Sequence, residues 1–329
     1  MQRTRLRLFS IDTTGLKVSC GNRDFCIKTG ITYLTFVNKI LVVINPVSGN
    51  QSGSSIFQKV RKFFQDSKLE VVTTTAVGEV FALAFRMKIE AYDQALIVGG
   101  DGTINEFVNG MMRRDDGRKI ALAFLPAGTG NSLMHHLGLL VPGDACRSIV
   151  SGARRRIDLL SVTTETGIHY AFNVVGWGLP STVNKRSEKW KFLRGQRYNM
   201  ASLLEIVRNP SWPVEIEFPG KVIRGKYCFF MACNTIYTGK GMKIAPDAIL
   251  DDGEMDVVML RAASRHKLVG LFSKIFKGRH IGNPLVEHYK VQSLKLSAED
   301  PGPLIIDGQV EGSTPFQIQV LKQELEICH

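Results

Sequence analysis

Three short apolar runs, each followed at once by a glycine- or proline-rich loop, constrain the fold of this chain most strongly. They occupy residues 40–44, 95–98 and 120–125. Continuous apolar runs of this length are typical of strands buried on both faces, as in a parallel sheet. A β-rich run at 70–75 and segments with helical spacing at 56–64, 80–87 and 104–112 alternate with them. The alternation predicts βαβ units, hence a parallel sheet with helices on both faces.

The pattern changes after about residue 157. Short β-like runs separated by turn residues follow, which is typical of an antiparallel, β-dominated domain. They lie at 158–163, 168–175, 214–218, 227–232, 255–260, 291–296, 304–306 and 316–321, with helical inserts at 198–207 and 264–277. We therefore expect an irregular extension with a hairpin at 1–37, an α/β domain at 38–156 and a β-rich domain at 157–329. The C-terminal end of the β-rich domain could pack back on the first domain.

The charge balance narrows the choice of partners. Among 329 residues, 42 Lys and Arg outnumber 30 Asp and Glu, for a net charge of +12. This excess favours nucleic acid, an anionic membrane or a phosphorylated ligand as partner. The sequence has no nucleic-acid-binding motif and no aromatic residues interleaved with its basic clusters. We therefore expect no nucleic-acid partner.

Cysteine usage and hydropathy bear on the cellular location. The six cysteines form no CxxC pair and have no histidine at zinc-ligand spacing, which predicts reduced structural thiols and a cytoplasmic setting. No apolar run approaches the ~18 residues that cross a bilayer, so we expect no integral membrane segment. The first acid is Asp12, after three arginines, which leaves an organellar presequence open.

Glycine-rich loops follow three predicted strands of the α/β domain. In open parallel sheets, ligands bind outside the carboxyl ends of the strands. Glycines there let main-chain N–H groups approach phosphate oxygens, and a helix that begins near Thr103 adds its positive dipole end. The Walker, dinucleotide and protein-kinase signatures are all absent. The loops at 45–49, 99–103 and 126–131 therefore predict a different phosphate-binding crevice, which carries one acid, Asp101.

These loops resemble the diacylglycerol-kinase catalytic family of lipid kinases. The resemblance spans about 38–329, and three further motifs place it nearest to the eukaryotic sphingosine and ceramide kinases. It implies an NAD-kinase/phosphofructokinase-like α/β domain that binds ATP, a β-rich domain that holds the lipid, and transfer between them. It rests on Asn45-Pro46, Gly99 to Thr103, Asn105-Glu106, Asn109-Gly110, Pro126 to Asn131, Ala245-Pro246, Asp251-Asp252-Gly253 and Asp307-Gly308, and on Gly176-Trp177-Gly178, Ser187-Glu188-Lys189 and Gly195 to Tyr198.

The resemblance also implies roles for individual residues. Phosphoryl transfer needs neutralised phosphates, in-line placement and a carboxylate that accepts the hydroxyl proton. We assign Asp101 as the general base and Asp307 as a second catalytic residue that helps to bind Mg²⁺ or to orient the hydroxyl. With ATP and Mg²⁺ as cofactors, the implied nucleotide site comprises Asn45, Pro46, Ser48, Gly49, Thr75, Gly99, Gly100, Gly102, Thr103, Glu106, Pro126, Gly128, Thr129, Gly130 and Asn131.

Two positions depart from the family pattern. Gln309 stands where relatives often have Glu, and Thr182 stands where sphingosine and ceramide kinases have an aspartate. A buried ammonium without a carboxylate is costly, so Thr182 favours a neutral lipid alcohol over sphingosine. The sequence nevertheless leaves diacylglycerol, ceramide and a sphingoid base open as substrates.

A basic amphipathic pattern at 264–277 predicts either a membrane-surface helix or an ordinary core-facing helix with a solvated rim. With the family resemblance, we expect peripheral binding to anionic membranes. The residues expected to contact lipid are Thr182, Tyr198, Leu203, Leu268 and Phe272.

Three functions remain compatible with the sequence. The leading hypothesis is an ATP- and Mg²⁺-dependent kinase that phosphorylates the primary hydroxyl of a lipid. The alternatives are a soluble-metabolite kinase of the NAD-kinase kind and a catalytically weak lipid-binding regulatory homologue.

Overall fold

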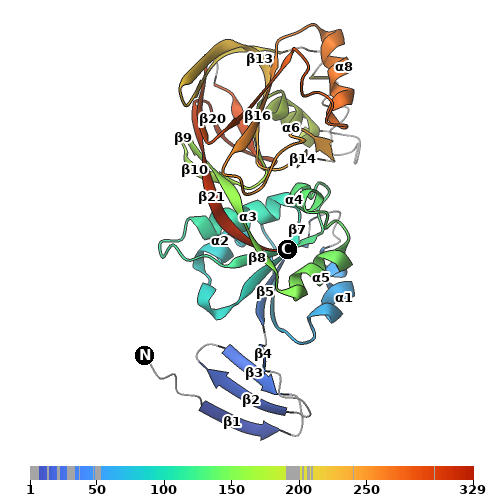
Figure 1. The fold of residues 1–329 in the computed structure, drawn as a ribbon, viewed down its shortest axis with the longest axis vertical. Coiled ribbons are helices and arrows are strands. Elements are labelled where there is room, and N and C mark those ends of the chain that lie inside the picture. The colour runs from blue at the N-terminus through green and yellow to red at the C-terminus, as the bar shows by residue number, and fades with distance from the viewer. Residues whose placement is uncertain are drawn as a thin grey trace.

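The computed structural model describes the backbone of residues 7–329, except 13–14, 21–22, 28–33, 37, 47, 49–52, 190–200, 202–203, 206–207, 209, 240 and 300. Side chains are described from residue 38 onward, except those of 185 and 187–189. The chain forms a parallel α/β body, a β-rich body above it and a small N-terminal sheet below (Figure 1).

The parallel body is built on four strands in the order β6-β5-β7-β8. They are β5 (Lys39–Ile44), β6 (Lys68–Thr73), β7 (Gln94–Gly99) and β8 (Ala121–Pro126). Helices α2 and α3 cover one face and α1 and α5 the other (Figure 1), which is why β7 and β8 are buried along their whole length. The helices are α1 (Gly53–Val60), α2 (Glu79–Arg86), α3 (Asp101–Met112), α4 (Ser132–His136) and α5 (Pro142–Ser151), with 3-10 turns at Arg61–Phe64 and Ile89–Ala91.

The strand order fixes where a ligand can bind. The connection from β5 leads to β6 on one side, whereas the connection from β7 leads to β8 on the other. The chain therefore changes direction between β5 and β7, and the loops that leave these two strands diverge there. Crevices at such a switch point are the usual ligand sites of open α/β sheets.

The β-rich body is antiparallel. Its main sheet runs β20-β19-β11-β13-β12-β18-β21, and β16 and β17 continue it from β13. Helices α6 (Leu179–Lys189) and α8 (Arg265–Ile275) lie beside it (Figure 1). Its strands are β10 (Gly167–Ala171), β11 (Val174–Gly178), β12 (Trp212–Phe218), β13 (Lys221–Cys233), β14 (Tyr237–Thr238), β15 (Met242–Lys243), β16 (Met255–Arg261), β17 (Val286–Val291), β18 (Ser293–Ala298), β19 (Pro303–Ile306) and β20 (Gln309–Ser313).

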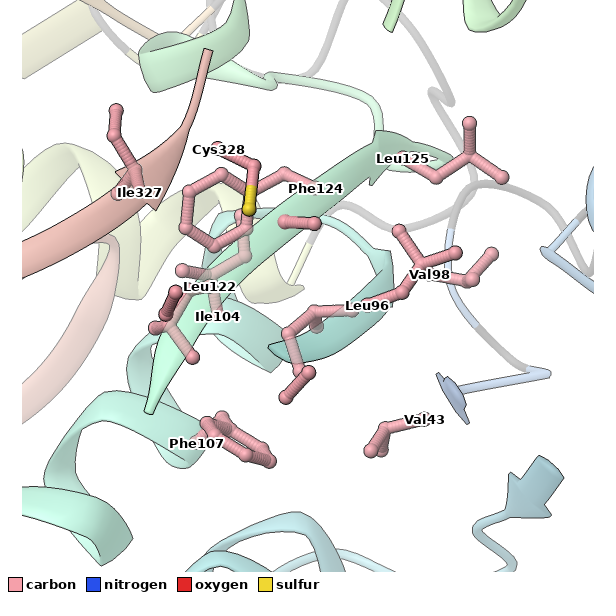
Figure 2. Packing of buried hydrophobic residues seen from close by; sticks show 14 of the residues in the cluster. Val43, Leu96, Val98, Ile104, Phe107, Leu122, Phe124, Leu125, Ile327 and Cys328 are labelled. Carbon is pink, nitrogen blue, oxygen red and sulfur yellow. The ribbon is translucent and has the colours of Figure 1, made fainter. Parts of the chain in front are cut away.

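Two long strands, β9 (Arg154–Thr164) and β21 (Phe316–Cys328), pair antiparallel and run from one body into the other (Figure 1). At its end, β21 turns parallel to β8, with Ile327 opposite Leu122. Figure 2 shows Ile327 and Cys328 packed among the buried side chains of the parallel sheet, near Phe124. The end of the sequence thus completes the core of the first body.

The sequence prediction and the structure agree on fold class, a parallel α/β part followed by an antiparallel β-rich part, which is therefore confirmed. They differ in detail. The N-terminal extension forms a four-stranded antiparallel sheet rather than an irregular segment, because its strands pair consecutively. These strands are β1 (Arg7–Asp12), β2 (Gly15–Cys20), β3 (Arg23–Ile27) and β4 (Leu34–Phe36).

Other differences concern the β-rich body. The predicted strand at 168–175 is two strands, because the chain bends at residues 172–173 to meet a buried carboxylate. The predicted strand at 291–296 is likewise divided between β17 and β18. The predicted helix at 198–207 lies mostly outside the described residues. Four cysteines are unpaired and buried, as expected of structural thiols: Cys146, Cys228, Cys233 and Cys328.

Candidate active site

The three glycine-rich loops converge at the carboxyl edge of the parallel sheet. After β5, the Asn45 amide donates a hydrogen bond to Thr103 Oγ1 at 3.0 Å, and Ser48 Oγ lies 3.2 Å from the same atom. After β7 and β8, the main chains of Gly100 and Gly128 touch. A Cβ built on Gly128 would lie only 2.4 Å from the Gly100 Cα. The loops thus meet at the switch point that the strand order defines.

Glycine is required where these loops touch. A Cβ on Gly99 would lie 2.6 Å from the Thr103 side chain, and one on Gly100 would lie 2.9 Å from the Gly128 Cα. No other residue type fits without moving main chain, so the crevice is lined by peptide groups. Its floor is the N-terminus of α3, a helix of 12 residues whose positive dipole end faces the loops. Such a surface suits a polyphosphate.

The third loop is held rigid by Asn131. This residue adopts a left-handed conformation (φ 51°) at the start of α4. Its side chain accepts a hydrogen bond from the Gly128 N–H at 3.0 Å and donates one to the Gly128 carbonyl at 2.8 Å. The loop therefore brings Gly130 close to the acid of the crevice, so that a Cβ there would lie 3.1 Å from Asp101 Oδ2.

Asp101 is the first residue of α3 and is partly buried. The Ser132 N–H donates to both carboxylate oxygens at 3.0 Å, and Ser132 Oγ donates to Oδ2 at 3.1 Å. Burial raises the pKa of Asp101, while hydrogen bonds from Ser132 and Asn173 act in the opposite direction. A carboxylate whose pKa is raised by its site is a better proton acceptor than one in water, which suits a general base.

Asp307 has a different environment. Its side chain is buried, and its residue is left-handed (φ 47°) in the turn after β19. Oδ1 accepts the N–H groups of Asn173 and Val174, both at 2.9 Å. Oδ2 accepts the Phe172 N–H at 2.9 Å and the Asn105 amide at 3.0 Å. Burial raises the pKa of Asp307 to about 6, against the effect of these donors.

This environment corrects the predicted magnesium role of Asp307. A carboxylate has about four lone-pair sites, and four N–H donors occupy those of Asp307. The residue therefore does not fit as a Mg²⁺ ligand. Within the described residues, no group of three or more His, Cys, Asp or Glu side chains could hold a metal ion.

Two family models match the chain in succession. The diacylglycerol kinase catalytic domain matches residues 39–162, and the YegS C-terminal NAD kinase beta sandwich-like domain matches 173–329. Both matches, with relatives named diacylglycerol kinase and sphingosine kinase, are consistent with the diacylglycerol kinase catalytic family predicted from the motifs, and they confirm the predicted enzyme class, a lipid kinase. A kinase of this kind uses ATP.

Named relatives of this family cover most of the chain. A diacylglycerol kinase of Bacillus subtilis (strain 168) is 27% identical over 294 residues, or 87% of this chain and 94% of the relative. Sphingosine kinase 1 of Arabidopsis thaliana is 25% identical over 334 residues, or 86% of this chain and 68% of the relative.

Solved structures support the fold. The crystal structure of a diacylglycerol kinase from Bacillus anthracis str. Sterne superposes with a TM-score of 0.67 at 19% identity, covering 89% of this chain and 97% of that one. A second crystal structure from that organism reaches 0.76 at 22% identity, covering 90% and 97%.

The remaining predicted nucleotide residues of this kinase surround the crevice. Pro126 pairs with Gly99 in register, and Pro46 follows Asn45. Thr129 is exposed at the tip of the third loop, and Gly49 lies outside the described residues. Gly102 lies against Gln309, whose Nε2 would be 2.6 Å from a Cβ at that position. Gln309, which stands where relatives often have Glu, therefore lies at the floor of the crevice.

Thr75 and Glu106 lie to one side of it. The Thr75 N–H and hydroxyl both donate to the carboxylate of Glu79, the first residue of α2, at 2.6 and 2.9 Å, so Thr75 is bound to the start of that helix. Glu106 is partly buried one turn further along α3, and burial raises its pKa while a hydrogen bond from the Gly78 backbone lowers it. Their roles in nucleotide binding stay predictions.

Sequence reasoning missed a hairpin from the β-rich body, formed by β14 and β15. The ring of Tyr237 lies 3.8 Å from that of His135 on α4. The Gly239 carbonyl oxygen would be 3.3 Å from a Cβ on Gly130. The hairpin thus closes over the third loop beside Asp101. The sequence signal for this turn was the pair of glycines Gly239 and Gly241, both of which adopt positive φ in the structure.

The predicted lipid residues are dispersed. Thr182 lies on α6, where its hydroxyl donates to the Leu179 carbonyl at 3.0 Å. Leu268 is 2% exposed and packs with Leu179 and Leu260, whereas Phe272 is partly buried beside it. Tyr198 and Leu203 lie outside the described residues. The apolar side of α8 thus faces the β-rich body, and its basic side faces solvent.

A cavity of about 750 Å³ lies at the opposite, amino edge of the parallel sheet, lined by residues such as Tyr92, Lys119 and Arg154. Its acids and bases pair with each other, and it contains none of the predicted site residues. Separately, no helix among the described residues has the length and apolar character needed to cross a membrane.

Proposed function

We propose that this chain transfers the γ-phosphoryl group of MgATP to the hydroxyl of a lipid in the crevice beside Asp101. The observation that carries the proposal is the contact between three glycine loops at a switch point, next to a single partly buried carboxylate. Main-chain N–H groups and the α3 N-terminus would hold the phosphates. Mg²⁺ enters with the nucleotide as part of the substrate, since it is often held largely by phosphates and water.

The reaction requires one proton acceptor. The lipid oxygen forms a bond to the γ-phosphorus, the bond from that phosphorus to the bridging oxygen of ADP breaks, and the hydroxyl proton passes to the Asp101 carboxylate. Ser132 holds this carboxylate in place from the side of α4. Asp307 holds the β-rich body against α3 through Asn105, so that the lipid and nucleotide sites keep a fixed relation.

The acceptor is a neutral lipid alcohol, such as diacylglycerol or ceramide. The first turn of α6 carries no acidic residue, and Thr182 stands at the family's aspartate position. Asn184 on the same helix donates to the Gly308 carbonyl at 2.9 Å, which places α6 beside the Asp307 turn. Without a carboxylate there, the ammonium of a sphingoid base would be desolvated without compensation.

We further propose that the kinase is cytoplasmic and binds anionic membranes through α8. Arg265, Lys267 and Lys274 are exposed on this helix, while Leu268 and Leu271 are buried against the β-rich body. Binding would therefore be electrostatic and would weaken with salt. Lys267→Glu with Lys274→Glu should abolish binding to anionic vesicles, whereas Lys59→Glu on α1 should not. Equal binding to neutral vesicles at all ionic strengths would contradict this.

A substrate panel tests the main proposal. MgATP should raise the melting temperature, and labelled phosphate should pass from ATP to diacylglycerol or ceramide more readily than to sphingosine. Transfer to NAD but to no lipid would indicate the soluble-metabolite alternative. Stabilisation by MgATP without any transfer would indicate the weak regulatory homologue.

A further inference from the structure

A short hairpin of the β-rich body, formed by β14 and β15, is a sheet of its own. Each strand has two residues, and Tyr237 pairs with Lys243 and Thr238 with Met242. A lone two-stranded hairpin is at best marginally stable in water, so this one depends on its neighbours. The side chain of Met242 packs against buried residues of the β-rich body, and further support comes from α4.

His136, the last residue of α4, supplies a hydrogen bond to this hairpin. Its Nδ1 accepts the Ile236 N–H at 3.0 Å, from 100 positions away in the sequence. The Ile236 carbonyl is used at the base of the hairpin, where it accepts the Ala245 N–H at 3.4 Å. His136 thus takes the place that a neighbouring strand would occupy. One residue earlier on α4, the ring of His135 lies 3.8 Å from that of Tyr237.

The His136 ring is suited to accept this hydrogen bond. A main-chain N–H can only donate, so Nδ1 carries no proton and the neutral ring has its proton on Nε2. Burial lowers the pKa of His136 to about 4, and the positive charge of Arg155 acts in the same direction. The ring is therefore neutral at neutral pH, which is the state that can hold the hairpin.

The hairpin lies beside the proposed base. The Cβ position of Gly130 would be 3.1 Å from Asp101 Oδ2 and 3.3 Å from the Gly239 carbonyl oxygen, so these two atoms flank one point. Ser132, the first residue of α4, holds the Asp101 carboxylate. One short helix therefore fixes both the base and the part of the β-rich body that covers it.

Cover at this point matters for the proposed reaction, because water competes with the lipid hydroxyl. A water oxygen would form the bond to the γ-phosphorus, the bond to the bridging oxygen of ADP would break, and Asp101 would take the proton, which gives ADP and inorganic phosphate. Enzymes limit such side reactions by excluding water from the closed site.

We infer that His136 is a positioning residue, which anchors the β14–β15 hairpin over the third glycine loop so that the lipid hydroxyl, and not water, reaches the γ-phosphoryl group. This inference rests on the proposed function. It assigns the choice between phosphoryl transfer and hydrolysis to a contact between the two bodies.

His136→Leu tests the inference, and His136→Asn is its rescue variant. Leucine removes the acceptor, whereas asparagine places Oδ1 as many bonds from Cα as Nδ1 is in histidine. Leaving an N–H without its acceptor shifts an equilibrium by about fivefold or more. The ratio of ATP hydrolysis to lipid phosphorylation should therefore rise at least about fivefold in His136→Leu and less than about twofold in His136→Asn.

Hydrogen exchange of the hairpin amides gives a second readout, which needs no substrate. Exchange should be at least about fivefold faster in His136→Leu and near the wild-type rate in His136→Asn. Arg113→Ala is the matched control. It removes a different bond between the two bodies, from Arg113 Nη2 to the Ile168 carbonyl at 2.5 Å, and should leave both readouts unchanged.

An unchanged hydrolysis ratio in a folded His136→Leu protein overturns the inference, as does an equal rise in Arg113→Ala or a failure of His136→Asn to restore the ratio. If His136→Leu does not fold, His136→Phe keeps a ring without an acceptor and carries the same expectation. If the wild-type protein phosphorylates no lipid, the proposed function has failed and the role in the reaction falls with it. Hydrogen exchange would then still decide whether His136 holds the hairpin.

Discussion

Asp101 and Asp307 are both aspartates beside glycine at the end of a buried strand, yet the two regions around them are built differently. Asp101, at the edge of the parallel sheet, receives hydrogen bonds mainly from one residue, Ser132, and faces three loops of bare main chain. Asp307, in the β-rich body, is enclosed by four N–H donors from α3 and the β10–β11 bend.

The difference shows that sequence motif and chemical role are separable. A carboxylate with lone pairs to spare can accept a proton from a substrate. One whose lone pairs are saturated by buried donors serves instead to hold those donors together. In this kinase the first region is open to chemistry, and the second joins the two bodies.

The largest expected effect tests the Asp101 side of this comparison. Asp101→Asn removes the proposed base, and general-base catalysis is typically worth about 10²–10⁴-fold, so kcat for lipid phosphorylation should fall by that factor. The melting temperature should not fall, because burial already disfavours the charge of Asp101. Near-full turnover in a folded Asp101→Asn protein would show that this carboxylate is not the base.

Asp307→Ala should affect stability instead. The substitution leaves four buried N–H groups without their acceptor, which should lower the free energy of unfolding by about 3–5 kcal/mol in urea titrations. Asp144→Ala, which breaks an exposed ion pair with Arg147, should cost about 1 kcal/mol or less. A comparably small cost for Asp307→Ala would remove the distinction between the two regions.

Gly128→Ala tests whether the bare main chain near Asp101 is the nucleotide site. The new Cβ would lie 2.4 Å from the Gly100 Cα and 2.8 Å from Asn131 Oδ1, which forces the loops apart. We expect calorimetry to show about 100-fold weaker binding of MgATP, or about 2.7 kcal/mol. Gly143→Ala on α5, where the added Cβ meets only Arg147 at 3.8 Å, should bind normally. Unchanged affinity in Gly128→Ala would place the nucleotide elsewhere.

The smallest effect is expected for Asn105→Ala. It removes one of the four donors to Asp307 and a hydrogen bond to the Tyr170 carbonyl, both at 3.0 Å, and the acceptor of the Asn109 amide at 3.1 Å. The free energy of unfolding should fall by about 1–2 kcal/mol, less than in Asp307→Ala, because three donors to the carboxylate remain. In the Asn105→Ala/Asp307→Ala double variant, the two losses of unfolding free energy should not add, because both substitutions remove the same contact. Full additivity would argue against a shared network.

The sequence predicted what is local. Each glycine loop follows its own strand, so the strands, the loops and their meeting at one sheet edge could be inferred from residues 40–131. The role of Asp307 could not, because its donor Asn105 lies 202 positions away and the donors Phe172, Asn173 and Val174 lie 133–135 positions away. No pattern in the sequence connects residues at such separations.

The lipid-contacting residues were harder to predict for another reason. An amphipathic pattern reports that one side of a helix is apolar but not what that side meets. The apolar side of α8 packs against Leu179 and Leu260 of the β-rich body, so Leu268 belongs to the core and is not exposed for contact with lipid. The β14–β15 hairpin escaped notice because strands of two residues carry no periodicity.

The return of β21 to the parallel sheet has a consequence for biosynthesis. Ile327 and Cys328 fill part of the core beneath β8, and Ile327 supplies the neighbour of Leu122 (Figure 2). A nascent polypeptide that has emerged only as far as α5 therefore has an unfinished interior and an unpaired sheet margin. N-terminal domains usually fold first during synthesis. Here the parallel body cannot complete its fold before β21 has been synthesised.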